Sequence, residues 1–580
     1  SSTAPALGRR AAAGLGVTAL ATALVAGAPA AGAAPKTAPP GPPPVELQLL
    51  ALNDFHGQLE TPSGSSSRLP GYATDVAFGG AEYLATQVRQ LEAASKKQNT
   101  LTVAAGDLIG ASPLLSAAFH DEPAIEALNR IGLDYASVGN HEFDEGSAEL
   151  LRIQNGGCHP EDGCADPQLP YQGADFQYLS ANAFVTETKQ PLLPPYAIHK
   201  VQGVEVGFIG MTLENTPSVV TPSGVAGLEF TDEAATANKY AAELQAQGVE
   251  AIVVLLHEGG SQTGATNVNG CTGMTGPITQ IVPQMTDAID VVVTGHTHQA
   301  YNCEIDGRLV TSASSAGRLV TDIDLRLDRR TGDVLDAVAN NVPVSRDVTK
   351  DPAQSALIAR YRELLGPIAG EVVGNAPTAI RHTPARETLF GSVLGESPLG
   401  NLIADAQLAA TRDLGSVAAF MNPGGVRADL EAGPITYEEA FTVQPFGNYL
   451  STIVLTDAQL QCVLEQQFAL GTVLQPAGIT YTVNASGTSA SRTAPCTGTR
   501  VADETVAIGG VPIAKDGVPS YRITVNNFLA DGGDGFSTFA QGTGRDDVES
   551  PEDDLAAFIG YLTATAPTAA PATDRITVRP

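Results

Sequence analysis

The chain has 580 residues, of which 43% are hydrophobic, and its formal net charge is −31 at pH 7. This hydrophobic fraction is typical of a globular protein, and the length allows roughly two or three domains with large cores. The charge argues against a nucleic acid polymer as a partner, because a long polyanion would be repelled, and against an anionic membrane surface. A small phosphate ester is still admissible, because metal ions and local arginines set the potential inside a cleft.

The first 44 residues have the composition of an export signal followed by a linker. Arg9 and Arg10 precede an apolar stretch at residues 11–28, and small residues at 31–33 offer a cleavage site. We expect residues 1–34 to be a signal peptide, with the secretory and twin-arginine routes both open, and the Pro-rich residues 35–44 to be an extended linker. No second run of about 20 apolar residues follows. The mature protein is therefore expected outside the cell or in the cell-envelope space, without a membrane span.

Six cysteines fit an exported protein. Sequence proximity favours three local disulfides over the other connectivities: Cys158 with Cys164, Cys271 with Cys303, and Cys462 with Cys496. The first pair flanks an Asp/Gly/Pro loop that lacks the C-x-x-C spacing of a zinc site. All six cysteines are therefore predicted to be structural.

Five runs that read as buried strands each end in residues that can bind a metal. The runs cover residues 47–52, 101–105, 135–138, 251–256 and 291–294. The candidate residues that follow them are Asp54, His56, Asp107, Asn140, His141, His257, His296 and His298. Because strands of an open α/β sheet build their sites at the carboxyl ends, these side chains are expected to lie together.

Such a set suits two divalent metal ions, zinc, manganese or a similar metal. Two ions about 3.5–4 Å apart can clamp a phosphoryl group and activate a water, and they need one carboxylate that bridges both. Asp107 is the natural bridge, because it lies between the earlier and the later candidates in the chain. His298, two residues beyond His296 on a segment expected to be extended, would point to the opposite side and reach the other ion.

His141 would lie beside the metals without binding them. This position suits a general acid, or a stabiliser of charge on the departing oxygen, with Asp144 orienting the imidazole ring. Taken singly, a His-x-His pair is more often a surface or core feature, and Asp54 or Asn140 could be a turn or cap residue. The whole set in this order, each part after a strand, favours the metal site.

A domain boundary is predicted at residues 346–370. A strand at residues 321–325 and its hairpin close the first domain, which covers residues 45–345. Helical apolar spacing follows at residues 351–365, and Gly366 and Pro367 end this interdomain helix. The second domain is expected at residues 371–565, with an Ala/Pro/Thr-rich tail at residues 566–580.

Glycine-flanked loops of the second domain carry aromatic and polar side chains, at residues 421–427, 445–448 and 526–536. Two phenylalanines presented on loops, Phe446 and Phe528, can sandwich a base, and such stacking contributes about 1–3 kcal/mol per base. Arg427 can form a forked contact with phosphate or ribose oxygens. Each phenylalanine alone could instead be a core residue. The Asp-Gly-Gly-Asp-Gly segment lacks the spacing of an EF-hand, so a turn is the simpler interpretation.

The order D-x-H, G-D, G-N-H-E, H and G-H-x-H resembles that of the calcineurin-like metallophosphoesterases. The sequence N-D-F-H-G at residues 53–57 resembles the 5′-nucleotidases in particular, including bacterial exported UDP-sugar hydrolases. The loops of the second domain resemble the 5′-nucleotidase C-terminal domain. The resemblance implies an α/β fold (α+β overall), in which a four-layer metallophosphoesterase β-sandwich flanked by helices is joined by a helix to a second α/β domain.

The resemblance also implies roles for individual residues. One ion would be held by Asp54, His56, Asp107 and His298, and the other by Asp107, Asn140, His257 and His296. His141 and Asp144 match the catalytic dyad. In the second domain, Phe446 and Phe528 would stack on the base and Asn422 and Asn448 would lie near it. Arg427 would contact phosphate or ribose, and Asp534 would bind the ribose.

One departure from the family pattern concerns phosphate recognition. Relatives commonly place one or two arginines just before the helix start N-x-G-N, where this chain has Gly-Glu-Ser-Pro-Leu-Gly-Asn at residues 395–401. Arg381 and Arg386 are nearby but out of register. The preference among mono-, di- and sugar nucleotides therefore stays open.

Residues and resemblance together imply an exported dinuclear-metal phosphohydrolase that acts on extracellular nucleotides, with nucleoside di- and triphosphates or UDP-sugars as further substrates. Catalysis would require the two domains to close together, by a rotation at the interdomain helix. One alternative is a 2′,3′-cyclic-nucleotide phosphodiesterase and 3′-nucleotidase on the same scaffold, although that branch tends to use tyrosines in place of Phe446 and Phe528. Another is a non-catalytic nucleotide-binding surface protein, which would have lost metal ligands that this chain retains.

Overall fold

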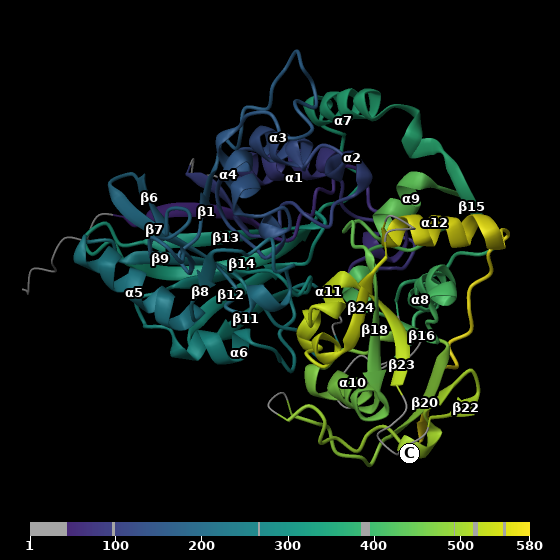
Figure 1. Ribbon diagram of the computed structural model, residues 1–580. Coiled ribbons are helices and arrows are strands. Elements are labelled where there is room, and N and C mark those ends of the chain that lie inside the picture. The colour runs from purple at the N-terminus through teal and green to yellow at the C-terminus, as the bar shows by residue number, and fades with distance from the viewer. Residues whose placement is uncertain are drawn as a thin grey trace, which may run out of the picture. The chain divides into compact units, whose positions relative to one another are not determined.

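The computed structural model describes residues 43–95, 99–264, 267–383, 395–491, 494–513, 520–548 and 553–579. The predicted signal peptide (1–34) and residues 35–42 of the predicted linker lie outside the described residues. The described residues form two α/β domains, coloured purple to teal and green to yellow in Figure 1. The predicted fold class is confirmed.

Two six-stranded sheets form the centre of the first domain. The first has the strand order β14 (Val334–Pro343), β13 (Leu319–Leu327), β1 (Val45–Leu52), β2 (Thr100–Ala105), β3 (Leu133–Ser137), β4 (Gln177–Leu179). The second has the order β11 (Ala300–Ile305), β12 (Arg308–Ala313), β10 (Val291–Thr294), β9 (Ala251–His257), β7 (Val204–Thr212), β6 (Tyr196–Val201). Strands β1 to β4 are parallel, as are β7, β9, β10 and β12. Their carboxyl ends therefore gather at one edge of each sheet.

Strand β1 shows why each sheet is buried on both faces. Successive side chains of a strand point to opposite faces. Leu49 belongs, with Val253 of the second sheet, to the core between the sheets, whereas Leu50 faces the helices on the other side. Helices α1 (Ala81–Ala94), α3 (Glu122–Ile131) and α4 (Ser147–Asn155) cover this outer face, beside the short α2 (Leu114–Ala117).

Helices α5 (Glu233–Ala246) and α6 (Ile278–Ile281) cover the outer face of the second sheet in the same way. A small pair of strands, β5 (Ala183–Val185) and β8 (Leu228–Phe230), completes the domain. The sequence of layers is helix, sheet, sheet, helix, as in the predicted four-layer sandwich.

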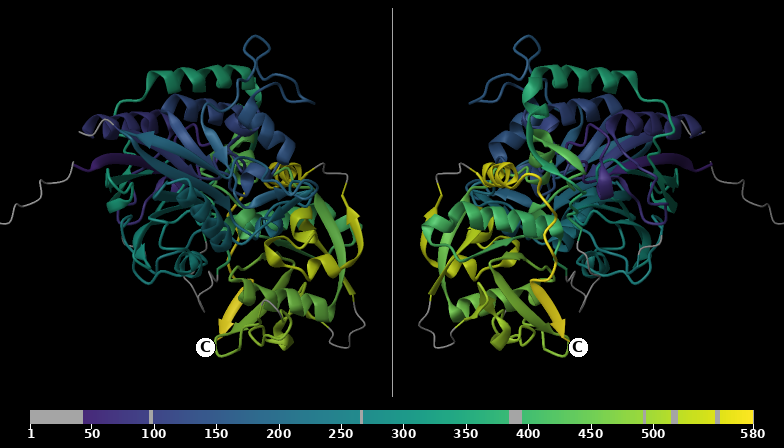
Figure 2. Two further views of the ribbon diagram at one scale, coloured as in Figure 1. Left: turned by 90° about the vertical axis from the view of Figure 1, so that its left-hand side faces the viewer. Right: turned by 90° about the vertical axis from the view of Figure 1, so that its right-hand side faces the viewer.

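The helix expected at residues 351–365 is α7 (Pro352–Leu365). The Asp351 carboxylate accepts a hydrogen bond from the backbone N–H of Gln354 (2.8 Å) and so caps the helix start. The helix packs on the first domain next to α1 and α3 (Figure 2). Its Leu357 and Tyr361 side chains are buried against residues of that domain, among them Ala127 of α3. Arg362 near its end forms ion pairs with Glu60 of the first domain and with Glu438 of the second.

The second domain is built on a five-stranded sheet. Its order is β19 (Gln475–Ala477), β16 (Ala418–Met421), β23 (Ser520–Asn526), β18 (Leu450–Thr456), β24 (Thr543–Asp547). Helices α8 (Pro398–Thr411) and α12 (Asp554–Thr565) pack on one face, and α10 (Asp457–Leu470) packs on the other. The remaining elements are α9 (Tyr437–Val443), α11 (Asn527–Ala530), and the strand pair β15 (Val372–Ala376) and β17 (Gly433–Thr436).

The predicted tail at residues 566–580 requires a correction. Its end forms strand β25 (Ile576–Arg579), which joins a four-stranded sheet with β22 (Val511–Pro512), β21 (Ala507–Ile508) and β20 (Ile479–Asn484). The side chain of Ile576 is part of the domain core, and Arg575 pairs with the Asp405 carboxylate at 2.7 Å. These contacts hold residues 575–579 on the domain, although the residues that precede them are rich in Ala, Pro and Thr.

Three disulfides join the cysteines as predicted: Cys158–Cys164, Cys271–Cys303 and Cys462–Cys496. The second links a loop after β9 to strand β11, and the third links helix α10 to the loop after β20. Each lies within one domain, so the disulfides stabilise the domains separately.

Candidate functional site

The predicted metal-binding residues lie where strands of both sheets end. Strands β1, β2, β3, β9 and β10 are the five predicted from the sequence. They bring together Asp54, His56, Asp107, Asn140, His257, His296 and His298. Except for His296 and His298, which are partly exposed, these residues are buried. Two sheets thus contribute to one buried polar cluster, although the residues span some 240 positions of the chain.

Sharp turns after the strands aim these side chains. The backbone is in the left-handed region at Asp54, His56, Asp107, His296 and His298, with φ between 48° and 68°. Residues other than glycine rarely adopt this conformation, which costs on the order of 1–3 kcal/mol where the surroundings impose it. The prediction that His296 and His298 lie on an extended segment is therefore wrong. The chain turns at both positions, and the two imidazoles still reach different groups of residues.

The first group contains Asp54, His56 and His298. Nε2 of His56 lies 3.0 Å from Nε2 of His298, which in turn lies 3.4 Å from Oδ1 of Asp54. The second group contains Asp107, His257 and His296, and Nδ1 of His296 lies 3.0 Å from Oδ1 of Asn140. Each group thus presents nitrogen and oxygen atoms at the spacing of ligands around one ion.

Asp107 lies between the two groups. Its Oδ2 is 3.0 Å from Nε2 of His257 and 3.6 Å from Nε2 of His56. One carboxylate oxygen therefore faces an imidazole of each group, which is the position that a bridging ligand requires.

The hydrogen bonds of the imidazoles test whether cations fit between them. His56 donates through Nδ1 to the carbonyl of Gly110 (2.9 Å), and His257 donates through Nδ1 to the carbonyl of Ala105 (2.7 Å). A carbonyl can only accept, so each ring in its neutral form presents the lone pair of Nε2 to the cluster. Nε2 of His257 is buried, faces the Asp107 carboxylate and makes no hydrogen bond. With a neutral ring, two acceptors would face each other here, so a proton or a metal ion has to lie between them, and these residues fit a dinuclear metal centre.

The charge of the cluster agrees with this reading. Burial alone would raise the pKa of the Asp54 and Asp107 carboxyls. The facing imidazoles lower it by a larger amount, so both pKa values lie below the usual range. Burial lowers the pKa of His296 to about 4, which keeps this ring neutral and able to bind a metal. Burial lowers the pKa of His257, but the Asp107 and Asp54 carboxylates raise it to about 10, so a metal ion bound to this ring would replace a proton. Buried carboxylates and imidazoles are the donor set that zinc and similar divalent ions prefer.

Glu142 holds two of the metal-binding loops together, a role that the sequence did not reveal. Its buried carboxylate accepts hydrogen bonds from the backbone N–H groups of Asp107 (2.9 Å) and Leu108 (2.7 Å), and from that of Gly139. Tyr178 donates a further hydrogen bond through its hydroxyl (3.3 Å). The motif G-N-H-E contains this residue, but nothing in the motif says that the glutamate faces the backbone of another loop.

Replacing Glu142 with glutamine is expected to weaken metal binding by about 10–100-fold, the usual effect of losing a group that orients ligands. The NH₂ group of the introduced amide would face backbone N–H donors, so at least one hydrogen bond would be lost. Equilibrium dialysis against graded zinc concentrations measures this change. Glu187→Gln, at an exposed position, is the matched control. Unchanged affinity in Glu142→Gln would show that the loops hold their positions without this carboxylate.

His141 lies beside the candidate metal ligands, and its ring contacts the Asp144 carboxylate. Nδ1 of His141 is 2.7 Å from Oδ2 of Asp144. Burial lowers the pKa of His141, but the Asp144 and Asp107 carboxylates together raise it by more, so the net direction is upward. His141 is also within ligand distance of His56 and Asp107, so its position alone does not separate a general acid from a metal ligand.

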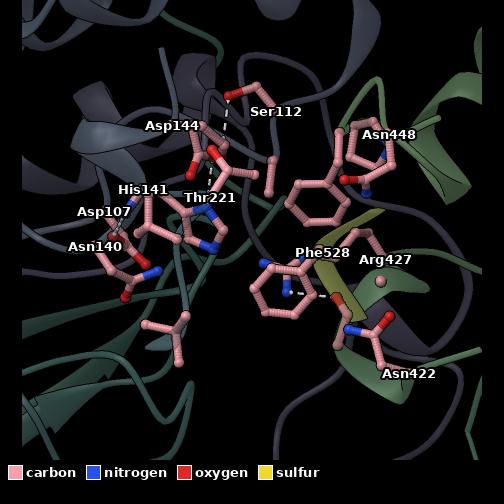
Figure 3. Close-up of a pocket in the computed structure, with 18 of the residues that line it drawn as sticks. Asp107, Ser112, Asn140, His141, Asp144, Thr221, Asn422, Arg427, Asn448 and Phe528 are labelled. Atoms are coloured by element: carbon pink, nitrogen blue, oxygen red, sulfur yellow. Dashed lines mark hydrogen bonds and ion pairs between the residues drawn. The ribbon is translucent and has the colours of Figure 1, made fainter. Parts of the chain in front are cut away.

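A cleft of about 460 Å³ connects this cluster to the second domain. Figure 3 shows His141 and Asp144 on one side of the cleft, and Asn422, Arg427, Asn448 and Phe528 on the other. All six residues predicted to bind substrate line it: Asn422, Arg427, Phe446, Asn448, Phe528 and Asp534. Loop residues of the first domain without any sequence signal, among them Ser112 and Thr221, complete the lining.

Contacts across the cleft place the second domain close to the metal cluster. Nη2 of Arg427 lies 3.5 Å from Nε2 of His56, and its guanidinium lies over the ring of Phe446 at 5.8 Å. The Phe446 ring also stacks on His141, with centroids 5.8 Å apart. Asn422 donates to the Asp534 carboxylate (2.9 Å), and this bond holds the acidic side chain at the cleft wall.

Glu396 lies just before α8, where the resemblance led us to expect arginines. Glu396 accepts hydrogen bonds from the backbone N–H of Ile576 (2.6 Å) and from the amide of Asn401 (2.7 Å), so it binds the last strand. Arg381 pairs with Asp429 and Glu431, and Arg386 lies outside the described residues. Among the described residues that line the cleft, Arg427 is the one arginine.

Two family models match the chain: the calcineurin-like phosphoesterase model over residues 47–300 and the 5′-nucleotidase C-terminal domain model over residues 372–541. Endonuclease YhcR of Bacillus subtilis is 35% identical over 522 residues, which cover 89% of this chain and 40% of that protein. Cell wall protein Lmo0130 of Listeria monocytogenes is 32% identical over 551 residues, which cover 89% of this chain and 67% of that protein. The solved structure of a 5′-nucleotidase precursor from Thermus thermophilus has a TM-score of 0.73 at 26% identity, covering 92% of this chain and 100% of that chain.

The chain thus spans less than half the length of YhcR and about two thirds of Lmo0130. None of the helices in the described ranges combines the length and apolar character needed to cross a bilayer.

Proposed function

Because the chain belongs to the family that joins a calcineurin-like metallophosphoesterase domain to a 5′-nucleotidase C-terminal domain, we propose that it removes phosphate from extracellular nucleotides. The first domain would supply the metal ions and the chemistry, and the second would capture the nucleoside. The observation that carries this proposal is the cleft, which has candidate metal ligands on one wall and two phenylalanines on the other. A nucleotide has the matching chemistry, with a phosphate at one end and a stacking base at the other.

Two divalent ions, of zinc, manganese or a similar metal, would be held by the seven residues of the cluster. The proposed ligands of one are Asp54, His56, Asp107 and His298, and those of the other are Asp107, Asn140, His257 and His296. When bound, such ions polarise a phosphoryl group and activate a water. The chain itself fixes the ligand geometry through its strand ends, through the carbonyl partners of His56 and His257, and through Glu142.

His141 would donate a proton to the departing ribose oxygen. Asp144 accepts the hydrogen of Nδ1 and thereby leaves Nε2 as the nitrogen that faces the reaction. The upward pKa direction of His141 fits an acid that is protonated near neutral pH. Arg427 would neutralise phosphate charge between the metal cluster and Phe446.

The other proposed contacts set the nucleoside position. Phe446 and Phe528 would stack on the base, with Asn422 and Asn448 near it, and Asp534 would accept from ribose hydroxyls. Nucleoside di- and triphosphates and UDP-sugars are further candidate substrates, because the arginines that relatives carry before helix α8 are replaced here.

Export is part of the proposal. It is supported by the signal-like residues 1–34, by three disulfides, and by the relationship to a protein named as a cell wall protein. Extracellular nucleotides would then be the substrates that the enzyme meets.

Replacing Phe446 or Phe528 with alanine should raise the KM for AMP about 5–150-fold, which corresponds to the loss of about 1–3 kcal/mol of stacking. Both rings are partly exposed at the cleft. Steady-state phosphate release from AMP measures the effect. Hydrolysis of a small aryl phosphate, which has no base to stack, should change less than twofold.

Phe441→Ala is a suitable control, because Phe441 packs beside Tyr437 and does not line the cleft. Equal loss of activity on AMP and on the aryl phosphate in the Phe446 and Phe528 variants would assign these rings to the domain core. The enzyme would then be a phosphatase without a nucleoside site.

A second candidate function is cleavage of phosphodiesters, as the name of the relative YhcR suggests for that protein. The observation that favours it is a second cavity of about 420 Å³ on the other side of His298 and Arg427, where a group beyond the phosphate would have room. Its walls carry more carboxylates (Glu60, Asp429, Glu431, Glu438 and Glu439) than arginines (Arg318, Arg362 and Arg427), and this net negative charge disfavours a polyanion. Nucleotides therefore remain the preferred substrates.

A further inference from the structure

A second cluster of histidines and carboxylates lies apart from the dinuclear centre, on loops next to α3 and α4. Nδ1 of His120 is 2.7 Å from Oε2 of Glu145, and its Nε2 is 2.9 Å from Oδ2 of Asp162. The ring of His159 stacks on that of His120 with centroids 3.7 Å apart. One candidate ligand atom from each of His120, Glu145 and His159 lies within 4.8 Å of the other two.

The fold holds these side chains in place through three separate segments. His120 shortly precedes the start of α3, and Glu145 precedes α4. His159 lies in a small loop closed by the disulfide Cys158–Cys164 and by two backbone hydrogen bonds to Gly163 (2.9 and 3.0 Å). The side chains of His120 and His159 are only 22% and 14% exposed. A cation that bound here would therefore not have to order a loose loop.

We propose that His120, His159 and Glu145 bind a third divalent ion, for which zinc has the best chemical match. Two imidazoles and one carboxylate are a common zinc set, with a fourth position left for water or a further ligand. The Asp162 carboxylate faces the other nitrogen of His120, and the backbone N–H of Asp162 donates to Nδ1 of His159 (3.2 Å). It is thus placed to orient the rings, as carboxylates beside zinc-bound histidines do. The site shares no residue with the dinuclear centre.

The position of this ion would link it to the cleft. Glu145 lines the cleft and follows Asp144 in the chain, and Asp121, which follows His120, lines it too. An ion at this site would hold together the two loops that form this wall. It would stabilise the wall without touching the phosphate.

The alternative is a metal-free ion pair, in which His120 carries a proton between two carboxylates. The hydrogen bond to Glu145 raises the pKa of His120 to about 9. A metal and this proton compete for the same ring, so binding of zinc should release a proton. An ion pair alone would show no zinc dependence.

The test is the zinc content of the full-length protein after dialysis into zinc-free buffer, measured by mass spectrometry of the metal. Replacing His159 with glutamine should lower the content by one zinc per chain, both in the wild-type background and in Asp107→Ala. His199→Gln removes another histidine, one that contacts the hydroxyl of Tyr135, and should leave the content unchanged.

Zinc titration of the dialysed proteins gives a second, independent measurement. His159→Gln and Glu145→Gln should each lose one binding event, with an apparent Kd raised at least tenfold, while their circular dichroism spectra match the wild type. Equal zinc content and equal titrations in wild type and His159→Gln would overturn the proposal and leave the cluster as an ion pair.

Discussion

Replacing Asp107 with alanine is expected to abolish phosphate release and to remove at least one metal ion. The reason is the position of its Oδ2 atom, which lies 3.0 Å from Nε2 of His257 and 3.6 Å from Nε2 of His56. The carboxylate faces both groups of ligands, and no other acidic side chain of the described part of the chain belongs to a candidate metal group with either His257 or His296. Alanine would leave the two ions without their shared ligand.

The measurements are the kcat for AMP and the metal content of the same preparation. Asp175→Ala, at an exposed position, is a control for loss of a carboxylate elsewhere in the first domain. Normal metal content and a normal rate in Asp107→Ala would remove Asp107 from the bridging position. A normal content with no activity would instead give it a direct part in the reaction.

Replacing His141 with alanine is expected to lower kcat about 10²–10⁴-fold, the usual contribution of general acid–base catalysis, while both ions stay bound. Nδ1 of His141 lies 2.7 Å from the Asp144 carboxylate, which orients the ring. The proposed ligands His56 and His257 are instead oriented by backbone carbonyl groups. A general acid matters most when the departing oxygen is strongly basic. The loss should therefore be much smaller for an aryl phosphate with a weakly basic phenolate than for AMP.

Two results would contradict this role of His141. A drop in metal stoichiometry would make it a ligand, which its proximity to His56 and Asp107 permits. An equal loss of kcat for AMP and for the aryl phosphate would mean that the ring does not protonate the leaving group. Asp144→Asn offers a milder test of the dyad, because the amide can still accept from Nδ1–H but lacks the negative charge.

The strands of the first domain could be predicted because each is an apolar run that can be recognised in the sequence by itself. Apolar runs such as residues 251–256 are buried on both faces, and each ends in a polar residue at the same edge of the sheet. The candidate metal ligands could therefore be identified as the polar residues that follow these strands. The left-handed backbone at His296 and His298 could not be predicted, since no glycine marks these two positions and the turn is imposed by the surrounding loops.

Other parts of the site depend on contacts between distant segments. Glu142 binds the backbone of a loop more than 30 residues earlier in the chain, and Asn53 accepts from the N–H of Ala313 (2.7 Å). Both residues are within recognisable motifs, but their partners are not. The cluster of His120, Glu145 and His159 has no regular spacing in the sequence, so only the fold brings it together.

The end of the chain shows the limits of composition as a guide. The Ala/Pro/Thr-rich segment suggested a tail, but Ile576 and Val578 alternate with polar residues and pair with β20. So short a run is too weak a strand signal to outweigh the composition around it. The buried Glu396, which lies just before α8 where the resemblance led us to expect arginines, is explained by the same strand, because it accepts from the backbone of Ile576.

The measurement that tests the central claim most directly is metal-dependent phosphate release from a panel of substrates: AMP, ATP, UDP-glucose, 2′,3′-cyclic AMP and a single-stranded oligonucleotide. Each is assayed after chelation and again after zinc or manganese is returned. The account predicts release from AMP that disappears on chelation, returns with metal, and exceeds cleavage of the cyclic nucleotide and of the oligonucleotide in kcat/KM. Faster cleavage of the oligonucleotide or of the cyclic nucleotide than of AMP, or AMP hydrolysis that persists without metal, would contradict it.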